Sequence, residues 1–284
     1  MAFGATKKVE GNKQYTNYIG LAPVKVLSVN PNKEEIEKIT EVTQTEDPVY
    51  ILPTDKDYKR IKIDFYVKTV PEKCDGIDVT TRMTFFMEDS ARYNKDRSKV
   101  QVIDKYGRTA WVTPEEFKIG AVPTYSNGPA KIGEYRAAYV GEENIVRFLK
   151  TLLGIENIDV YKDSKWVENP IPTNCECQLD HIKDYFTGKF SELQNTIKLQ
   201  PDNIIKVLFG VRITENGTYQ TIYTEEFISG NYNKYDKLKR SYEERKTAET
   251  YRNAIFDTTA LHEYKIQPTE FKEPTETTEK SPWE

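Results

Sequence analysis

The sequence predicts an α+β fold: an OB-like antiparallel β-barrel core, interrupted by a helical insertion and followed by a disordered acidic C-terminal tail. Three observations carry this prediction. Strand-like segments fill residues 21–112, helical spacing dominates residues 142–197, and a hairpin returns at residues 204–228. Strands and helices are therefore grouped and do not alternate, which is typical of α+β proteins and fits a small barrel that contains an insertion.

The early strands follow from alternation of apolar and polar residues. Residues 61–67 place four apolar side chains on one face and polar ones on the other, and residues 79–87 repeat the pattern after a turn at residues 71–76. Residues 21–29 form the first strand candidate, and residues 100–103 and 109–112 flank a turn at residues 104–107. Between the first two strands, Asn32 and Glu35 have capping-box spacing, which predicts a short helix with Ile36 and Ile39 on its buried side.

The middle of the chain is predicted to be mostly helical. A helix begins at Glu142 and Glu143, carries Ile145, Phe148, Leu149 and Leu152 at helical spacing, and ends at Gly154. A second apolar stripe runs from the capping-box pair Thr173 and Glu176 to Phe186, and a third helix carries Phe190, Leu193 and Ile197.

The last part of the chain returns to strands and then loses apolar periodicity. Asn216 and Gly217 form the strongest hairpin signal, between strands at residues 204–214 and 218–228. A basic helix is predicted near residues 235–250, and the Pro-, Thr- and Glu-rich end reads as a disordered acidic tail. We therefore expect a flexible arm (1–19), one elaborated domain (20–255, with the helical insertion at about 113–200) and the tail (256–284).

Composition limits the function. The chain has 284 residues with 37% hydrophobic residues, and no apolar run approaches the roughly 18 residues of a membrane-spanning helix. Its beginning lacks the apolar stretch of a secretory signal, and three cysteines give no even disulfide framework. We therefore expect neither a membrane-spanning nor a conventionally secreted protein. A formal net charge of -4 excludes a uniformly basic nucleic-acid-binding domain but leaves room for a local basic face.

The segment 92–108 is the most informative local feature. It holds six basic and two acidic residues, with two tyrosines inside it and a tryptophan after it. Single-stranded nucleic acid is bound by cations that meet phosphates and by flat rings that stack on bases. The alternative is a solvated charged hairpin whose tyrosines pack along lysine stems. With two residues from the preceding strand, the predicted nucleic-acid contacts are Arg82, Phe86, Arg92, Tyr93, Lys95, Arg97, Lys99, Lys105, Tyr106, Arg108 and Trp111.

Two further features bear on binding. Residues 234–252 are basic with interleaved tyrosines, which also suits an ordinary amphipathic surface helix with ion pairs. The acidic tail could compete with phosphates for a basic groove, because it is a tethered polyanion. Trp283 and Glu284 at its tip could contact a partner protein. The alternative is an inert solubilising tail.

Metal and catalytic signals are weak. Cys175, Cys177 and His181 lie close in sequence and Cys74 could complete a zinc site, but a Cys-x-Cys pair chelates poorly and buried structural cysteines explain them better. Phosphate-loop, dinucleotide, zinc-protease and nucleophile-elbow motifs are absent from the sequence. Four carboxylates near strands could bind magnesium in a nuclease, although exposed strand-end acids are the simpler interpretation: Asp64, Asp78, Glu88 and Asp89. We expect no catalytic residue, no metal and no cofactor.

Several stretches together resemble a replication-gene product of tailed bacteriophages, especially the crAss-like group. They are LAPVKVLSVN at 21–30, IKIDFYVKT at 61–69, VQVIDKYGRTAWV at 100–112, AYVGEE at 138–143 and KVLFGVR at 206–212. That family is identified as single-stranded DNA-binding protein, and the resemblance covers roughly residues 20–255. It implies a protein of the host cytoplasm that coats single-stranded DNA without sequence preference. It also implies phage replication proteins as partners through the tail, and leaves a homo-oligomer open.

The function that we expect from these features is binding of single-stranded DNA in phage replication or recombination, without chemistry of its own. The alternative from another class is a virion-associated or structural protein whose tyrosine-rich surfaces contact other proteins. A metal-dependent nuclease is the third hypothesis.

Overall fold

The computed structural model describes most of the chain up to residue 229 and two short segments after it. The described residues are 15–18, 20–74, 76–104, 107–121, 135–153, 159–162, 165–168, 182–199, 204–214, 217–229, 254–255 and 267–269.

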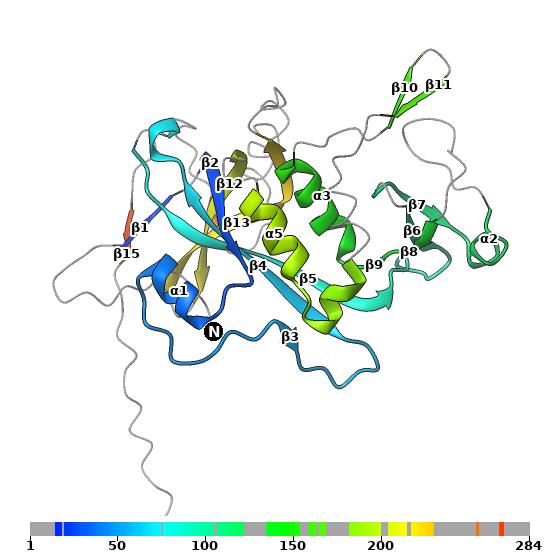
Figure 1. Cartoon of the computed structure of the whole chain (residues 1–284), viewed down its shortest axis with the longest axis horizontal. Coiled ribbons are helices and arrows are strands. Elements are labelled where there is room, and N and C mark those ends of the chain that lie inside the picture. Colours follow the sequence, from blue (N-terminus) through cyan, green and yellow to red (C-terminus); the bar gives the residue numbers. More distant parts are fainter. Residues whose placement is uncertain are drawn as a thin grey trace, which may run out of the picture.

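The largest element is a strongly curled antiparallel sheet that forms a half-barrel (Figure 1). Four of its strands have the order of a Greek key, because β12 returns by a long connection to lie beside β2. β13 contacts β5 as well as pairing with β12, which brings the two sides of the sheet toward each other. The main path of the sheet is β13 (Gly217–Ser229), β12 (Ile204–Thr214), β2 (Gly20–Val29), β4 (Arg60–Thr69), β5 (Thr80–Ala91) and β9 (Tyr139–Val140), with β3 (Ile51–Leu52) on β4 and β14 (Ala254–Ile255) on β12.

These long strands confirm the α+β prediction and the alternation on which it depends. In β4 the odd-numbered residues 61–67 are buried in the core, and in β5 Met83, Phe85 and Met87 meet them from the neighbouring strand. The even-numbered residues of both strands point to the other side of the sheet. β12 and β13 pair in antiparallel register up to Thr214 opposite Gly217, as the predicted hairpin requires, while residues 215–216 lie outside the described residues.

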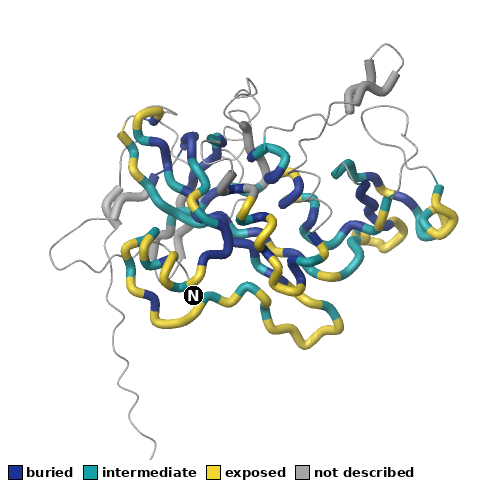
Figure 2. Tube along the Cα trace, viewed as in Figure 1, coloured by how far each residue is buried: buried dark blue, intermediate teal, exposed yellow. Residues whose placement is uncertain are grey.

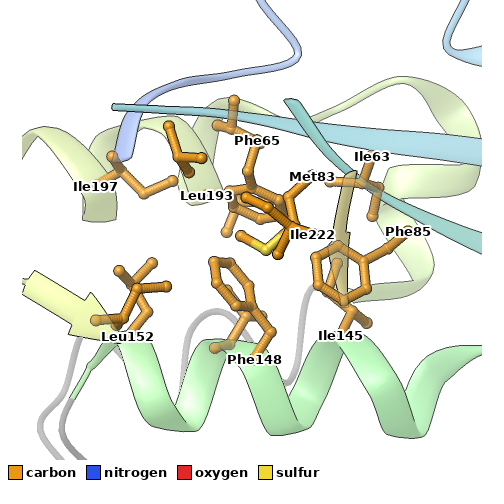
Figure 3. Packing of buried hydrophobic residues seen from close by; sticks show 14 of the residues in the cluster. Ile63, Phe65, Met83, Phe85, Ile145, Phe148, Leu152, Leu193, Ile197 and Ile222 are labelled. Carbon is orange, nitrogen blue, oxygen red and sulfur yellow. The ribbon is translucent and has the colours of Figure 1, made fainter. Parts of the chain in front are cut away.

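Helices fill the concave side of the sheet. They are α3 (Glu142–Leu152), the 3-10 helix η2 (Ile182–Thr187) and α5 (Ser191–Leu199). Phe148 of α3 points into the centre of the core, where its ring centroid lies 4.5 Å from that of Phe65 and 5.2 Å from that of Phe85 (Figure 3). Such aromatic contacts contribute about 0.5–1.5 kcal/mol each beyond the buried area. The apolar spacing that predicts α3 and α5 is therefore the spacing of their core-facing side chains.

A glycine allows α3 to begin directly against the sheet. Gly141 has a φ of 83°, and a Cβ atom at this position would lie 2.0 Å from the carbonyl oxygen of Phe86 in β5. Only glycine combines this backbone angle with such a close approach.

A small second sheet extends from the far end of β5, on the right in Figure 1. It has the order β7 (Thr109–Val112), β6 (Val100–Asp104) and β8 (Tyr135–Ala137), and one face has a core of its own around Val100 and Val102. Ile103 on the other face belongs to the main core. The short helix α2 (Pro114–Lys118) follows β7 and begins with a capping box of Thr113 and Glu116. Neither β8 nor α2 was expected from the sequence.

The connection from β2 to β4 carries α1 (Lys33–Thr40), which begins with the predicted capping box of Asn32 and Glu35. Left-handed backbone flanks this helix on both sides: Asn30 has a φ of 44° and Glu41 a φ of 55°. Exposed residues concentrate along this connection and at the turns of the small sheet, whereas the centres of the long strands are buried (Figure 2).

Some predictions differ from the structure. The insertion contains the strands β8, β9, β10 (Asp159–Lys162) and β11 (Lys165–Glu168) beside its helices. The described part of the stripe ending at Phe186 is the 3-10 helix η2, and not an α-helix. In the predicted arm and tail, β1 (Tyr15–Asn17) pairs with β15 (Gln267–Thr269). The helix predicted near residues 235–250 and the tail residues Trp283 and Glu284 lie outside the described residues.

Candidate nucleic-acid interface

The even-numbered side chains of β4 and β5 form one surface on the side of the sheet away from the core. We call it the β4–β5 outer face. The register places Lys62 directly opposite Phe86, and Tyr66 directly opposite Arg82. Directly opposite side chains in an antiparallel pair are near neighbours, so each of the two rings on this face lies beside a cation of the other strand. Its members are Lys62, Asp64, Tyr66, Lys68, Thr80, Arg82, Thr84 and Phe86.

Phe86 is the exposed ring of this face. It is 45% exposed, although β5 is a central strand. The guanidinium carbon of Arg60 lies 5.1 Å from the centroid of its ring, and Arg60 also faces Glu88 at 3.7 Å. A large exposed ring with a cation on it can stack on a base and bring a positive charge to the adjacent phosphate.

Arg82, the second predicted contact on this face, is held inside a polar cluster. Its Nη1 atom lies 3.4 Å from Oδ2 of Asp64, and it hydrogen bonds to the hydroxyl of Tyr66. The same Asp64 carboxylate accepts a hydrogen bond from Oγ1 of Thr84 at 2.7 Å and lies 3.2 Å from Nζ of Lys62. Burial raises the pKa of Tyr66, although Arg82 works in the opposite direction. The tyrosine is therefore a neutral hydrogen-bonding group at physiological pH.

Among the described residues of the segment 92–108, the turn between β5 and β6 presents the exposed cations. Lys95, Arg97 and Lys99 are all exposed, and Arg97 adopts left-handed backbone with a φ of 60°. The guanidinium carbon of Arg97 lies 4.7 Å from the ring centroid of Tyr93, which is itself 41% exposed. This turn therefore combines a ring and three cations, as the sequence predicts for a nucleic-acid contact.

Local hydrogen bonds fix the shape of this turn. The side chain of Asn94 accepts from the backbone N–H of Lys99 at 2.9 Å, and Asp96 accepts from the backbone and the hydroxyl of Ser98. These bonds from Ser98 hold the pKa of Asp96 below its ordinary value. Asn, Asp and Ser form such turns readily, because their short side chains bond to nearby backbone groups.

Arg92 and Trp111 lie together on the face of the small sheet that meets α3. Arg92 donates to Glu143 at 2.6 Å and to Gln101 at 3.0 Å, and its guanidinium carbon lies 5.7 Å from the ring centroid of Trp111. Burial alone would raise the pKa of Glu143, but the hydrogen bonds from Gln101 and Arg92 outweigh it and hold this pKa below its ordinary value. Trp111 remains 40% exposed and accessible for stacking, whereas the charge of Arg92 is compensated.

Arg108 is also compensated by a carboxylate. Its Nε and Nη2 atoms each lie 2.6 Å from Oδ2 of Asp104, across the turn between β6 and β7. Lys150 of α3 donates to the carbonyl of Gly107 in this turn at 3.0 Å and holds the turn against the helix. Burial lowers the pKa of Lys150 to about 8. The predicted contacts Lys105 and Tyr106 lie in the same turn but outside the described residues.

The structure thus divides the predicted contacts into two groups. Phe86, Tyr93 and Trp111 offer exposed rings, and Lys95, Arg97 and Lys99 offer exposed cations. The arginines at positions 82, 92 and 108 each face a carboxylate. Arg60, Lys62 and Tyr66 were missed as candidates, although the alternation of β4 already placed Lys62 and Tyr66 beside Arg82 and Phe86 on the polar face.

The described residues hold no group of three potential metal ligands. The carboxylates considered for a magnesium site face cations instead of one another. Asp64 faces Lys62 and Arg82, and Glu88 faces Arg60. Oδ1 of Asp78 lies 3.0 Å from Nζ of Lys68. Cys74 is buried and donates to the carbonyl of Val70, while Cys175, Cys177 and His181 lie outside the described residues. Among the described helices, none has the length and apolar character to cross a membrane.

Comparison with known proteins adds no relative. No family model matches the chain, and neither a curated protein nor a solved structure matches it.

Proposed function

We propose that this protein binds single-stranded DNA without sequence preference, along the β4–β5 outer face and the turn between β5 and β6. The observation that carries the proposal is Phe86: an exposed ring on a central strand, with Arg60 on its face and Lys62 directly opposite. Single-strand binders combine such stacking rings with cations that follow the backbone.

The arrangement of the sheet supports the choice of this face. We interpret the curled sheet as an OB-type barrel, a five-stranded, partly open Greek-key barrel in which the face of the second and third strands binds oligonucleotides. In chain order the five long strands are β2, β4, β5, β12 and β13. Their spatial order, with β2 between β12 and β4, fits this fold and makes β4 and β5 the second and third strands.

The resemblance to phage replication proteins extends the proposal to the biological setting. The protein would coat strands exposed during replication or recombination in the host cytoplasm, without chemistry or a cofactor of its own. The acidic tail, with Trp283 and Glu284 at its end, is the proposed contact for other replication proteins. A homo-oligomer is compatible with this role.

The test is fluorescence anisotropy of a labelled oligo-dT, titrated with the full chain at two salt concentrations. We expect binding that weakens with salt, because counterions are released when cations meet phosphates. Phe86→Ala should weaken binding by about 1–3 kcal/mol, the usual worth of one stacked base. Ile119→Ala is the control, since Ile119 is 80% exposed, lies at the end of the short helix α2 and is not part of the β4–β5 outer face.

Two results would contradict the proposal. Absence of DNA binding by the wild type at low salt would exclude the proposed function. If the protein also forms a stable oligomer at low salt, the role in protein–protein contacts is favoured instead. Equal affinities of Phe86→Ala and the wild type would remove the β4–β5 outer face from the binding site.

A further inference from the structure

Part of the β4–β5 outer face is buried although it points away from the core. The side chain of Asp64 is 2% exposed and those of Lys62 and Arg82 are 19% exposed each. Tyr66, between them, is 3% exposed as a residue. Phe86 on the same face is far more accessible. Another segment of the chain must therefore lie over the middle of this face.

That segment is the connection between β2 and β4, which contains α1. The helix contacts β5, and the ring centroid of Tyr50 lies 5.6 Å from Nζ of Lys62. The hydroxyl of Tyr50 donates to the carbonyl of Pro31 at 2.5 Å, which ties the end of the connection to its beginning. Burial raises the pKa of Tyr50, and the charges of Asp64, Tyr66 and Glu35 of α1 act in the same direction.

α1 is lightly attached. Ile36 is its one buried side chain, and the helix has only eight residues, too few to be stable in isolation. The residue before the segment and the residue after the helix, Asn30 and Glu41, both have left-handed backbone. Asn adopts such angles readily and a left-handed residue commonly ends a helix, so the two positions mark where the chain changes direction before and after α1.

The net charge of α1 is opposite in sign to that of the group beside it. Lys62 and Arg82 share the single carboxylate of Asp64, so this group carries one net positive charge. α1 carries Glu34, Glu35 and Glu37 against Lys33 and Lys38, a formal charge of -1, and Glu35 acts electrostatically on the hydroxyl of Tyr50. A segment of net negative charge beside a cationic group opposes the approach of a phosphate backbone.

We propose that α1 is a hinged cover, residues 31–40, that turns at Asn30 and Glu41 and controls access of a DNA strand to Lys62, Tyr66 and Arg82. This inference rests on the proposed function and adds its regulation. A strand first meets the exposed ring of Phe86 and the β5–β6 turn. Displacement of the cover then exposes one more ring and two more cations, so the measured affinity includes the cost of opening.

The test loosens the cover and measures binding and opening separately. Ile36→Ala removes most of the one buried side chain of α1. We expect this variant to bind labelled oligo-dT about threefold to tenfold more tightly than the wild type, because more of the protein is open. Hydrogen exchange with mass spectrometry should show faster exchange of residues 33–40 in the variant. Ile119→Ala is the matched control: the same change at an exposed position should alter neither quantity.

Two further variants make the test specific to α1 and to the surface beneath it. Asn32→Ala removes the cap of α1 and loosens the same helix without touching the sheet, so it replaces Ile36→Ala if that variant does not fold. Arg82→Gln should reduce oligo-dT affinity more in the loosened background than in the wild type, because Arg82 contacts DNA only when the cover is open.

The outcomes separate the two proposals. Faster exchange of α1 with unchanged or weaker DNA binding overturns the cover and leaves single-strand binding in place, provided that the wild type binds. Absence of binding by the wild type and by every loosened variant overturns the proposed function itself and the cover with it. The cover is supported if both loosened variants bind DNA more tightly and Arg82→Gln reduces affinity more in the loosened background than in the wild type.

Discussion

Nη1 of Arg92, at the end of β5, lies 2.6 Å from Oε2 of Glu143 in the first turn of α3. This contact joins the small sheet to the helix that fills the half-barrel, and Gln101 of β6 donates to the same carboxylate oxygen at 3.0 Å. The arginine that the sequence offers as a DNA contact therefore has a structural role in the described protein.

Replacing Glu143 should weaken this joint. We expect Glu143→Gln to lower the free energy of unfolding at pH 7 by roughly 1 kcal/mol, a modest value because both side chains are partly exposed. Since the pKa of Glu143 is lowered in the folded protein, its stabilisation is present above the unfolded pKa of about 4.3 and is lost as the pH falls through the folded pKa. Urea unfolding of both proteins between pH 3 and 7 measures the difference.

Glu115→Gln is the matched control for that experiment. Glu115 is also the second residue of a helix, α2, and is exposed, so both substitutions lose the same interaction with the helix dipole. Equal destabilisation by the two substitutions would show that the contacts with Arg92 and Gln101 contribute nothing.

Gly141 should tolerate no side chain. In Gly141→Ala the methyl group would meet the carbonyl oxygen of Phe86, a backbone atom that cannot rotate away. Gly120→Ala has a similar backbone cost, about 1–2 kcal/mol at a φ of 64°, but no atom within 4 Å of the added Cβ. We expect Gly141→Ala to be less stable than Gly120→Ala by a further 1–3 kcal/mol or so, measured by thermal unfolding. Equal melting temperatures would refute the close approach of α3 to β5.

Lys150 should make stability depend on pH in the alkaline range. Burial lowers its pKa to about 8 from 10.5, so between these values the unfolded chain binds more protons than the folded one. The contribution of Lys150 to the free energy of unfolding therefore rises as the pH increases from about 8 to 10.5. Lys150→Met abolishes the rise, and the wild type should gain about 1–3 kcal/mol relative to the variant over this range. The measurement is urea unfolding of both proteins at about pH 7.5 and 10. The same difference in unfolding free energy at both pH values would disprove the predicted effect of Lys150.

The salt dependence of DNA binding should distinguish exposed from paired cations. Lys95→Ala should reduce the slope of log K against log salt by about 0.7, the value for one phosphate contact on a single strand. Arg108→Ala should change the slope less, because Asp104 already neutralises this arginine in the free protein. The measurement is a salt titration of oligo-dT binding for each variant. A larger change for Arg108 would mean that its ion pair opens on binding.

Local patterns predicted the elements well because they report which face of an element is buried. The alternation at Ile61 and Ile63 and the spacing of Phe148 and Leu152 correspond to core-facing side chains, and the capping box at Asn32 fixed the start of α1. The short strands β3 and β8 escaped prediction, because strands this short owe their existence to a neighbouring strand and not to their own sequence.

The candidate site was harder to predict than the fold. Sequence shows that Arg82, Arg92 and Arg108 are cations, but their compensation depends on partners brought near by folding. Asp104 is four positions from Arg108 and could have been paired with it in advance, whereas Glu143 is 51 positions from Arg92. The contact of Tyr50 with Lys62 likewise follows from how the connection between β2 and β4 folds against the sheet, which no local pattern encodes.

The Greek-key order also governs how the protein can fold as it is synthesised. The side chain of Gln220 in β13 accepts from the backbone of Tyr18 and donates back to it, across 202 positions of sequence. One edge of β2 likewise pairs with β12, which is synthesised much later in the chain. Until the middle of the chain has been synthesised, a sheet of β2, β4 and β5 has two unpaired edges, because β9 pairs with β5 and β12 with β2. Unpaired edges of this kind pair readily with other chains. Addition of β12 closes the edge of β2, so the late part of the chain removes one of these sites of association.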